Sequence, residues 1–230
     1  MNSRNNRFDP VRNLFFCLLI AVLTLGLVGN VFGREFQMAR LQYDGGGDWY
    51  NDPCKIPNLM EFYSRKIESE VIEEQAVVRA DDEEIFDYPI VFMTGHGNID
   101  FSEAEASSLR SYLKSGGFLY ADDDYGMDEA FRREIDKVFP DRPLVELSPE
   151  HPLFSSYFEF DELPRIHEHY PDDPPQAFGI QVDGEWVVLY TFNTNIADGW
   201  ASPEVHGNPP EVRKTALRFG VNIISWVFGQ

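Results

Sequence analysis

Residues 102–124, with the sequence SEAEASSLRSYLKSGGFLYADDD, contain the signals of a helix, a turn and a strand in direct succession. Ser102 and Glu105 form a capping box, in which the two side chains satisfy amide groups of the first helical turn reciprocally. The pair of glycines in the middle of the stretch ends the helix. The apolar run at 118–121 then predicts a strand that is buried on both faces, as in a parallel sheet.

The alternation of strand and helix continues on both sides of this stretch. Short apolar or β-branched runs predict further strands, and amphipathic patterns predict further helices. The predicted strands are 36–43, 75–80, 89–94 and 144–147, and the predicted helices are 57–72, 128–139 and 210–228. Such alternation predicts a doubly wound, mainly parallel α/β sheet.

The last third of the chain departs from this alternation. Residues 148–176 are rich in proline, histidine and acid, and we expect a long ordered loop or lid there. Asp183-Gly184 lies between the apolar runs 177–182 and 185–191, which predicts a late β-hairpin. Residues 192–210 are a second predicted loop.

The N-terminal 33 residues have the pattern of an export leader. Three arginines precede an apolar run at 14–31, and Val31-Phe32-Gly33 offers a cleavage site for a signal peptidase. The run is also long enough to be a retained membrane anchor. Basic residues before the run hold the N-terminus inside. We therefore expect 34–230 to be a single α/β domain in the periplasm, either free or tethered to the inner membrane.

The charge of the chain restricts its partners. It has 39 acidic and 19 basic residues, and without residues 1–33 the formal charge is −22. Nucleic acids and anionic lipids are therefore not expected partners, because their phosphates need lysine and arginine. Membrane contact is expected only through the N-terminal segment. Beyond that segment the chain has one cysteine, Cys54, and no Gly-x-Ser-x-Gly elbow, so nucleophilic catalysis has little support.

Three loops follow predicted strands and carry the candidate site residues. In a parallel sheet the carboxyl ends of these strands lie at one edge, so the loops should line a single cleft. The glycine loop at 44–49 comes first, followed by loops that begin near His96 and Asp122. The predicted ligand-binding residues are Asp44, Gly45, Gly46, Gly47, Asp48, Trp49, Asn98 and Tyr125, and the predicted catalytic residues are His96, Asp122 and Asp123.

The residue types in these loops favour some chemistries over others. His96 lies between two glycines and suits general acid–base work, although a histidine bonded to the loop backbone is the alternative. A glycine loop can cradle phosphate, but the aspartates around this one would repel it. Aromatic rings beside carboxylates suit a sugar or another polyol. A tight structural turn is the simpler alternative for the glycines.

The sequence is compatible with a bound divalent metal ion, but it identifies neither the metal nor any other cofactor. Asp122, Asp123 and Asp124 can ligate a cation, or they can favour the start of the following helix. The segment 167–169 puts two histidines on one side of an extended chain, without the HExxH pattern. His151 and His206 add further loop histidines.

Four motifs in order carry a family resemblance: YDGGGDWY at 43–50, GHGN at 95–98, GGFLYADD at 116–123 and HPLF at 151–154. Together they resemble a bacterial domain family of unknown function in the class I glutamine amidotransferase-like superfamily. The resemblance covers 36–230 and implies a flavodoxin-like sandwich. It does not imply glutaminase activity, because the elbow Ala121-Asp122-Asp123 lacks the cysteine of that superfamily. Relatives linked to sugar utilisation favour a glycan-type ligand by analogy of fold.

Two functions remain open at this point. The first is an exported, non-catalytic domain that binds a polar small molecule, a glycan or a protein partner at its acidic cleft. The second is a hydrolase of a carbohydrate-like substrate that uses His96 with Asp122 or Asp123, with or without a metal. The enzyme hypothesis gains support if Asp44, Asp122 or Asp123 lies within hydrogen-bond reach of His96, and it fails if these side chains point to separate regions of solvent.

Overall fold

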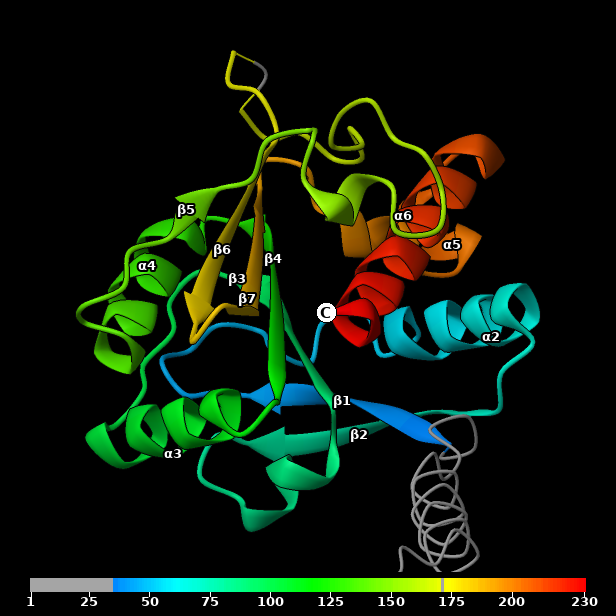
Figure 1. Cartoon of the computed structure of the whole chain (residues 1–230). Helices are drawn as coiled ribbons and strands as arrows, with labels where there is room; N and C mark the ends of the chain where they lie inside the picture. Colours follow the sequence, from blue (N-terminus) through cyan, green and yellow to red (C-terminus); the bar gives the residue numbers. More distant parts are fainter. Residues whose placement is uncertain (1–34, 171) are drawn as a thin grey trace, which may run out of the picture. The chain divides into compact units, whose positions relative to one another are not determined.

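Within residues 35–170 and 172–230, the computed structural model contains a seven-stranded sheet with helices on both faces (Figure 1). The strand order is β2-β1-β3-β4-β7-β6-β5. The strands are β1 (Phe36–Gln42), β2 (Val71–Arg79), β3 (Ile90–His96), β4 (Phe118–Tyr125), β5 (Val145–Glu146), β6 (Gln176–Val182) and β7 (Glu185–Phe192). The first five in spatial order run parallel, while β6 runs antiparallel to both of its neighbours. This confirms a doubly wound, mainly parallel α/β fold.

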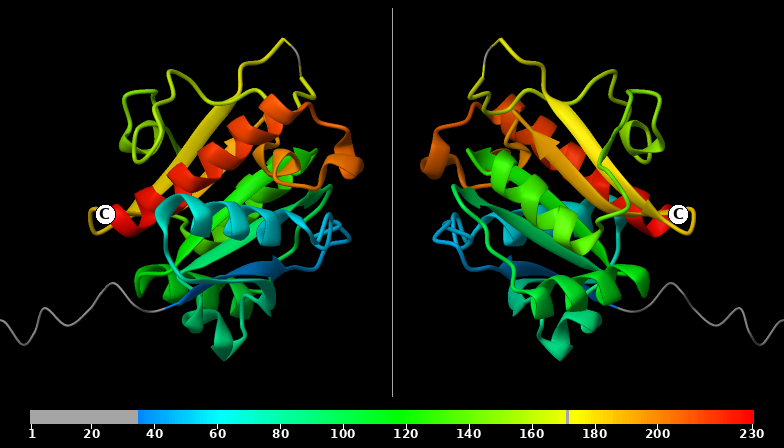
Figure 2. Two further views of the ribbon diagram at one scale, coloured as in Figure 1. Left: turned by 90° about the vertical axis from the view of Figure 1, so that its right-hand side faces the viewer. Right: turned by 90° about the vertical axis from the view of Figure 1, so that its left-hand side faces the viewer.

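Two helices cover each face of the sheet, and the two views of Figure 2 look onto these faces in turn. The helices are α2 (Lys55–Ile67), α3 (Glu103–Lys114), α4 (Asp128–Val138), α5 (Pro203–His206) and α6 (Pro210–Gly229). Helices α3 and α4 bury Leu109 and Phe131 against one face, while α2 and α6 bury Leu59 and Phe219 against the other. Each such side chain contributes about 1.5–3 kcal/mol when it is fully buried.

The capping box and the hairpin turn that the sequence predicts are both present in the structure. The Ser102 hydroxyl accepts a hydrogen bond from the Glu105 amide at 3.2 Å, and the Glu105 carboxylate accepts one from the Ser102 amide at 2.9 Å. Asp183 and Gly184 have φ angles of 54° and 100°, which the tight turn between β6 and β7 requires. The capping box and the hairpin are thus confirmed.

The helix predicted at 57–72 is wrong at its carboxyl end. Helix α2 ends at Ile67, because Glu68 adopts a left-handed conformation with φ 55°. Val71 and Ile72 instead begin β2, where they pair with the first residues of β1. Both are β-branched and gain more from sheet pairing than from an extended helix. Strand β2 is therefore longer than the predicted 75–80.

The described residues between β5 and β6 form a long loop that includes the short helix η2 (Pro152–Phe154). Buried Asn222 of α6 anchors it. The Asn222 amide donates to the carbonyl oxygens of Leu153 at 3.0 Å and Phe158 at 2.7 Å, and its own oxygen accepts from the Phe158 amide at 2.8 Å. These hydrogen bonds hold the loop against α6. The chain then continues to His167 at the edge of the sheet.

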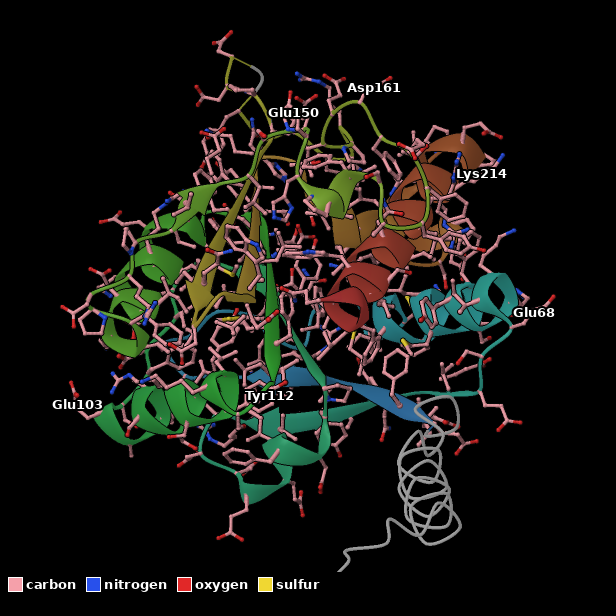
Figure 3. The ribbon with its side chains drawn as sticks, in the orientation of Figure 1. Glu68, Glu103, Tyr112, Glu150, Asp161 and Lys214 are labelled. Carbon is pink, nitrogen blue, oxygen red and sulfur yellow. The ribbon has the colours of Figure 1, made fainter. Side chains whose placement is uncertain are left out.

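Charged side chains are concentrated on the surface. Figure 3 shows Glu68, Glu103 and Asp161 pointing away from the ribbon, whereas Tyr112 is buried against the sheet and donates to the Tyr88 carbonyl at 2.8 Å.

None of the helices in 35–170 and 172–230 combines the length and the hydrophobicity that a bilayer span needs. The predicted export leader at 1–33 lies outside the described residues.

Candidate functional site

The loops after β1 and β3 lie against each other at the carboxyl edge of the sheet. Asp44 and Asp100 form an isolated antiparallel bridge, and the Gly47 amide donates to the Asn98 carbonyl at 3.0 Å. A Cβ atom at Gly47 would lie 2.7 Å from that carbonyl oxygen. Glycine is therefore required at this position for close approach of two backbones. The tight packing explains at least one glycine of the loop without a ligand.

Buried Arg40 of β1 holds the glycine loop from beneath. Its guanidinium donates to the carbonyl oxygens of Trp49 at 2.9 Å, Asn51 at 2.5 Å and Asp52 at 3.1 Å. Burial lowers the pKa of Arg40 to about 10, although the nearby Asp52 opposes this shift. The fork of donors fixes three carbonyl groups of the loop at once.

The fixed loop places Asp48 beside His96. The two carboxylate oxygens of Asp48 lie 3.2 and 3.0 Å from His96 Nδ1, and one of them also accepts from the His96 backbone amide at 2.5 Å. On the other side of the ring, His96 Nε2 lies 3.6 Å from Asp124 Oδ1. The His96 side chain is 47% exposed, whereas Asp124 is buried. When a carboxylate accepts a hydrogen bond from Nδ1–H of a neutral imidazole, Nε2 has a lone pair and can accept a proton or a hydrogen bond.

Asp124, and not Asp122 or Asp123, is the acid of β4 that faces His96. Strands β3 and β4 pair Gly95 with Asp123 but His96 with Tyr125, so Asp124 is the extra residue of a β-bulge. Among the described residues, no hydrogen bond or ion pair joins His96 to Asp122 or Asp123. The predicted pairing of His96 with these two aspartates is therefore replaced by Asp48 and Asp124.

Asp122 and Asp123 point to opposite faces of the sheet, as consecutive strand residues do. Asp122 accepts hydrogen bonds from the Thr191 hydroxyl and, at 2.6 Å, from the Ala197 amide. Asp123 accepts from the Met127 amide at 2.9 Å. Burial raises the pKa of Asp122 to about 7 and that of Asp123 to about 6. Both carboxyl groups are thus hydrogen-bonded to other groups of the protein.

The other predicted binding residues divide into two groups. Asp44 pairs with Arg79 at 2.7 Å, which lowers the pKa of that carboxyl, and Asn98 donates to the Gly45 carbonyl at 3.2 Å. Asp44 thus joins the glycine loop to the end of β2, and Asn98 joins the two loops to each other. Tyr125, in contrast, lies at the surface, where its ring stacks on Tyr170 at 6.0 Å.

Trp49 and Tyr50 form a second pair of aromatic rings, with their centroids 5.6 Å apart. Gly45 and Gly46 have φ angles of 110° and 91°.

A buried lysine lies behind Asp124. Lys55, the first residue of α2, is fully buried, and its ammonium is 2.9 Å from Asp198, 3.2 Å from Asp52 and 3.6 Å from Asp124. Burial alone would lower the pKa of Lys55, but the three carboxylates outweigh it and the pKa is raised. Lys55 therefore stays charged and joins the loop after β1, the end of β4 and the segment after β7.

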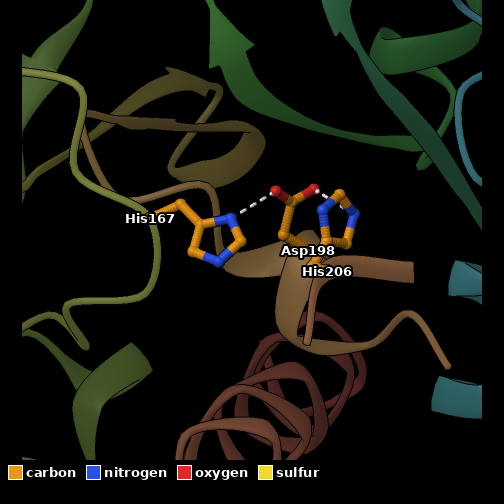
Figure 4. A group of neighbouring side chains, drawn as sticks. All are labelled: His167, Asp198 and His206. Carbon is orange, nitrogen blue, oxygen red and sulfur yellow. Dashed lines mark hydrogen bonds and ion pairs between the residues drawn. The ribbon is translucent and has the colours of Figure 1, made fainter. Parts of the chain in front are cut away.

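Asp198 belongs to η3 (Ile196–Gly199), which follows β7, and it lies between two imidazoles (Figure 4). His167 Nδ1 is 2.7 Å from Asp198 Oδ2, and His206 Nε2 is 3.3 Å from Asp198 Oδ1. His206 Nε2 also lies 2.6 Å from Asp52 Oδ2. Hydrogen bonding to Asp198 raises the pKa of His167. Although burial opposes it, His167 and Lys55 lower the pKa of Asp198.

Lys55, Asp52 and Asp198 are site residues that the sequence analysis missed. Lys55 resembles an ordinary surface lysine at the start of a helix, and no local pattern reveals its burial. The position of Asp198 in the sequence could have identified it as a site residue. It follows β7, which is another parallel strand that ends at the same edge of the sheet. His167 and His206 stood out only as loop histidines. Their contacts with Asp198 arise from tertiary structure.

Two cavities of the described chain lie away from these residues. One, of about 440 Å³, lies beside the acidic segment 159–165, and the other, of about 360 Å³, is lined by Trp186, Trp226 and His151. Neither includes a member of the cluster around Lys55 or of the His96 group. The polar residues at the sheet edge therefore define the candidate site by their chemistry.

The fold and the site define a doubly wound α/β domain with an acidic, histidine-containing carboxyl edge. The elbow expected at Ala121-Asp122-Asp123 is wrong, because these residues pair with β3 inside β4. Residues 37–228 match the family model described as "Domain of unknown function (DUF4159)", and the chain belongs to that family. No curated protein matches the sequence.

Proposed function

We propose that the protein is exported and binds a polar, hydroxyl-rich ligand, such as a saccharide, at the carboxyl edge of its sheet. The observation that carries the proposal is the half-exposed His96, held by Asp48 with Asp124 behind it. The leader pattern at 1–33 supports export. The resemblance to the class I glutamine amidotransferase-like superfamily, with its sugar-linked relatives, is part of the same proposal and rests on the four motifs.

The charges and rings around His96 favour hydroxyl groups over phosphate. Carboxylates accept hydrogen bonds from hydroxyls but repel phosphate, and the segments 43–54, 95–101 and 122–126 contain no lysine or arginine. Tyr125 and Tyr170 are 49% and 37% exposed, and they present aromatic surface to a sugar beside the polar groups. Sites for small polar molecules commonly combine a few fixed polar groups with aromatic walls.

Titration calorimetry with a panel of mono- and disaccharides tests this function. We expect at least one sugar to bind, with its affinity reduced about tenfold or more in Asp124→Asn and His96→Gln, because each removes about 1.4 kcal/mol or more of hydrogen bonding. Asp161→Asn, on an exposed loop, is the matched control and should bind as the unaltered protein does. Absence of binding across the panel, or equal binding by all variants, would overturn the proposal and leave a protein partner as the ligand.

Hydrolysis is the second candidate, and the His96–Asp48 pair is the observation that favours it. A base of this kind can activate a water through Nε2 while the carboxylate orients the ring. The residues differ from those expected from sequence, since Asp48 and Asp124 take the places of Asp122 and Asp123. Assays with p-nitrophenyl glycosides should then show turnover that falls about 10²-fold or more in His96→Gln. Turnover that persists in this variant would exclude His96 as the base.

A further inference from the structure

We propose that His167, Asp198 and His206, completed by Asp52, bind one divalent transition-metal ion of the zinc type. This site lies behind the His96 group and is independent of the saccharide proposal. Its donors come from four segments that meet only in the fold: the 148–175 loop, η3, α5 and the loop before α2.

The donor atoms are close enough for one ion. One ligand atom from each of His167, Asp198 and His206 lies within 4.8 Å of the other two. Asp52 Oδ2 adds a fourth donor, at 2.6 Å from His206 Nε2. Zinc holds nitrogen and oxygen ligands at about 2.0–2.2 Å in a tetrahedron, so its ligands are roughly 3.3 Å apart. The contacts of 2.6–3.3 Å between these side chains are close to that spacing.

The hydrogen bonds of Asn208 fix the tautomer of His167. The Asn208 amide nitrogen donates to the Asp198 carbonyl at 3.1 Å, so the amide oxygen is the atom that faces His167 Nε2 at 2.8 Å. Nε2 must therefore carry a hydrogen. In a neutral ring, Nδ1 then presents a lone pair to Asp198 Oδ2 at 2.7 Å. Two lone pairs this close require a cation between them, either a proton or a metal ion.

The local charges favour one divalent ion. Asp52, Asp124 and Asp198 surround the ammonium of Lys55, which neutralises one of their three negative charges. These carboxylates carry more negative charge than Lys55 neutralises, and a divalent ion supplies further positive charge. Asp198 Oδ1 is buried and accepts from Lys55 Nζ at 2.9 Å, which uses one of its two lone pairs. That oxygen keeps a lone pair for coordination.

The chemistry of the donors selects the type of ion. Two imidazoles and two carboxylates suit zinc and its neighbours in the first transition row, whereas calcium and magnesium prefer oxygen ligands alone. The imidazoles are also accessible, since the side chains of His167 and His206 are 31% and 23% exposed. An ion can therefore enter from solvent, while Lys55 closes the inner side.

Zinc titration of the full chain, purified without a histidine tag, tests the site. A chromophoric chelator measures affinity by competition, and cobalt substitution reports tetrahedral coordination through its visible absorption. We expect one zinc per chain and a loss of affinity of at least about 100-fold in His167→Gln and His206→Gln. His151→Gln, which changes a histidine in the Trp186–Trp226 cavity, is the matched control and should bind as the unaltered protein does.

Asn208→Leu separates a metal site from a purely structural cluster. The substitution removes the group that orients His167 without removing a ligand, and we expect zinc affinity to fall about 10–100-fold with the cobalt spectrum still tetrahedral. Circular dichroism checks that each variant folds. Zinc binding below about one-fifth of a site per chain at about 1 mM zinc, or affinity unchanged in all three cluster variants, would overturn the proposal.

Discussion

Lys55 Nζ lies 2.9 Å from Asp198 Oδ1, and both side chains are almost completely buried. This ion pair joins the start of α2 to the segment after β7. Asp124 extends it, because one of its oxygens is 3.6 Å from Lys55 and the other is 3.6 Å from His96. The exposed His96 group and the inner histidine cluster therefore share one electrostatic network.

Removal of the lysine should destabilise the fold strongly. Lys55→Met leaves Asp52, Asp124 and Asp198 without their common counter-ion, and breaking a buried ion pair costs about 3–5 kcal/mol. Urea unfolding followed by circular dichroism measures the loss. The exposed Lys114→Met is the matched control, with an expected change within about 0.5 kcal/mol. A Lys55 variant as stable as the control would contradict the network.

Asp122 should make stability fall as pH rises. Burial raises the pKa of Asp122 from 3.8 to about 7, so the fold favours the protonated carboxyl. This contribution is fully present below about pH 4 and is lost as pH rises through about 7, with a total on the order of 4 kcal/mol.

Asp122→Asn tests that linkage, because the amide keeps the size of the side chain and does not titrate. Unfolding free energies of both proteins between pH 4 and pH 8 should show a shallower decline in the variant. Asp161→Asn, on an exposed loop, should leave the pH profile unchanged. Parallel profiles for the unaltered protein and Asp122→Asn would show that burial of Asp122 does not shift its titration.

Arg40 should control the order of the glycine loop. Arg40→Lys keeps the charge but cannot donate to the carbonyl oxygens of Trp49, Asn51 and Asp52 together. Amide hydrogen exchange, read by mass spectrometry, should become faster in peptides that cover 44–54 and stay unchanged in α3. Unchanged exchange in the loop would mean that its own packing is sufficient.

Gly47 should not tolerate a side chain. In Gly47→Ala the new Cβ meets the carbonyl oxygens of Asn98 at 2.7 Å and His96 at 2.9 Å, so the two loops must separate. We expect a loss of about 1–3 kcal/mol in urea unfolding. Gly229→Ala has no atom within 4 Å of its Cβ and is the control, with little or no loss. Equal stability of the two variants would contradict the close contact of the loops.

The order of elements was predictable because its signals are local. The capping box at Ser102, the Asp183-Gly184 turn and the periodic apolar runs each depend on residues within one turn or strand. Glu68 shows the limit, since its left-handed conformation ends α2 where the apolar pattern continues.

The site was only partly predictable, because its contacts depend on register and on tertiary structure. The strand ends identified His96, Asp48 and the three aspartates of β4. A bulge between β3 and β4, which no sequence pattern revealed, determines that Asp124 faces His96. Lys55 and Asp198 are 143 positions apart in the printed numbering, and only the packing of α2 beside η3 brings them together.

Mapping a bound saccharide by ¹⁵N–¹H correlation spectroscopy tests the central claim most directly. The tightest-binding sugar of the calorimetric panel is added to the labelled protein, and shifted amides are placed on the structure. We predict that they cluster in 44–52, 95–98 and 122–126, around His96, Asp48 and Asp124. Shifts confined to the cavity at Trp186 and Trp226, or no shifts with any sugar, would contradict a ligand site at the carboxyl edge of the sheet.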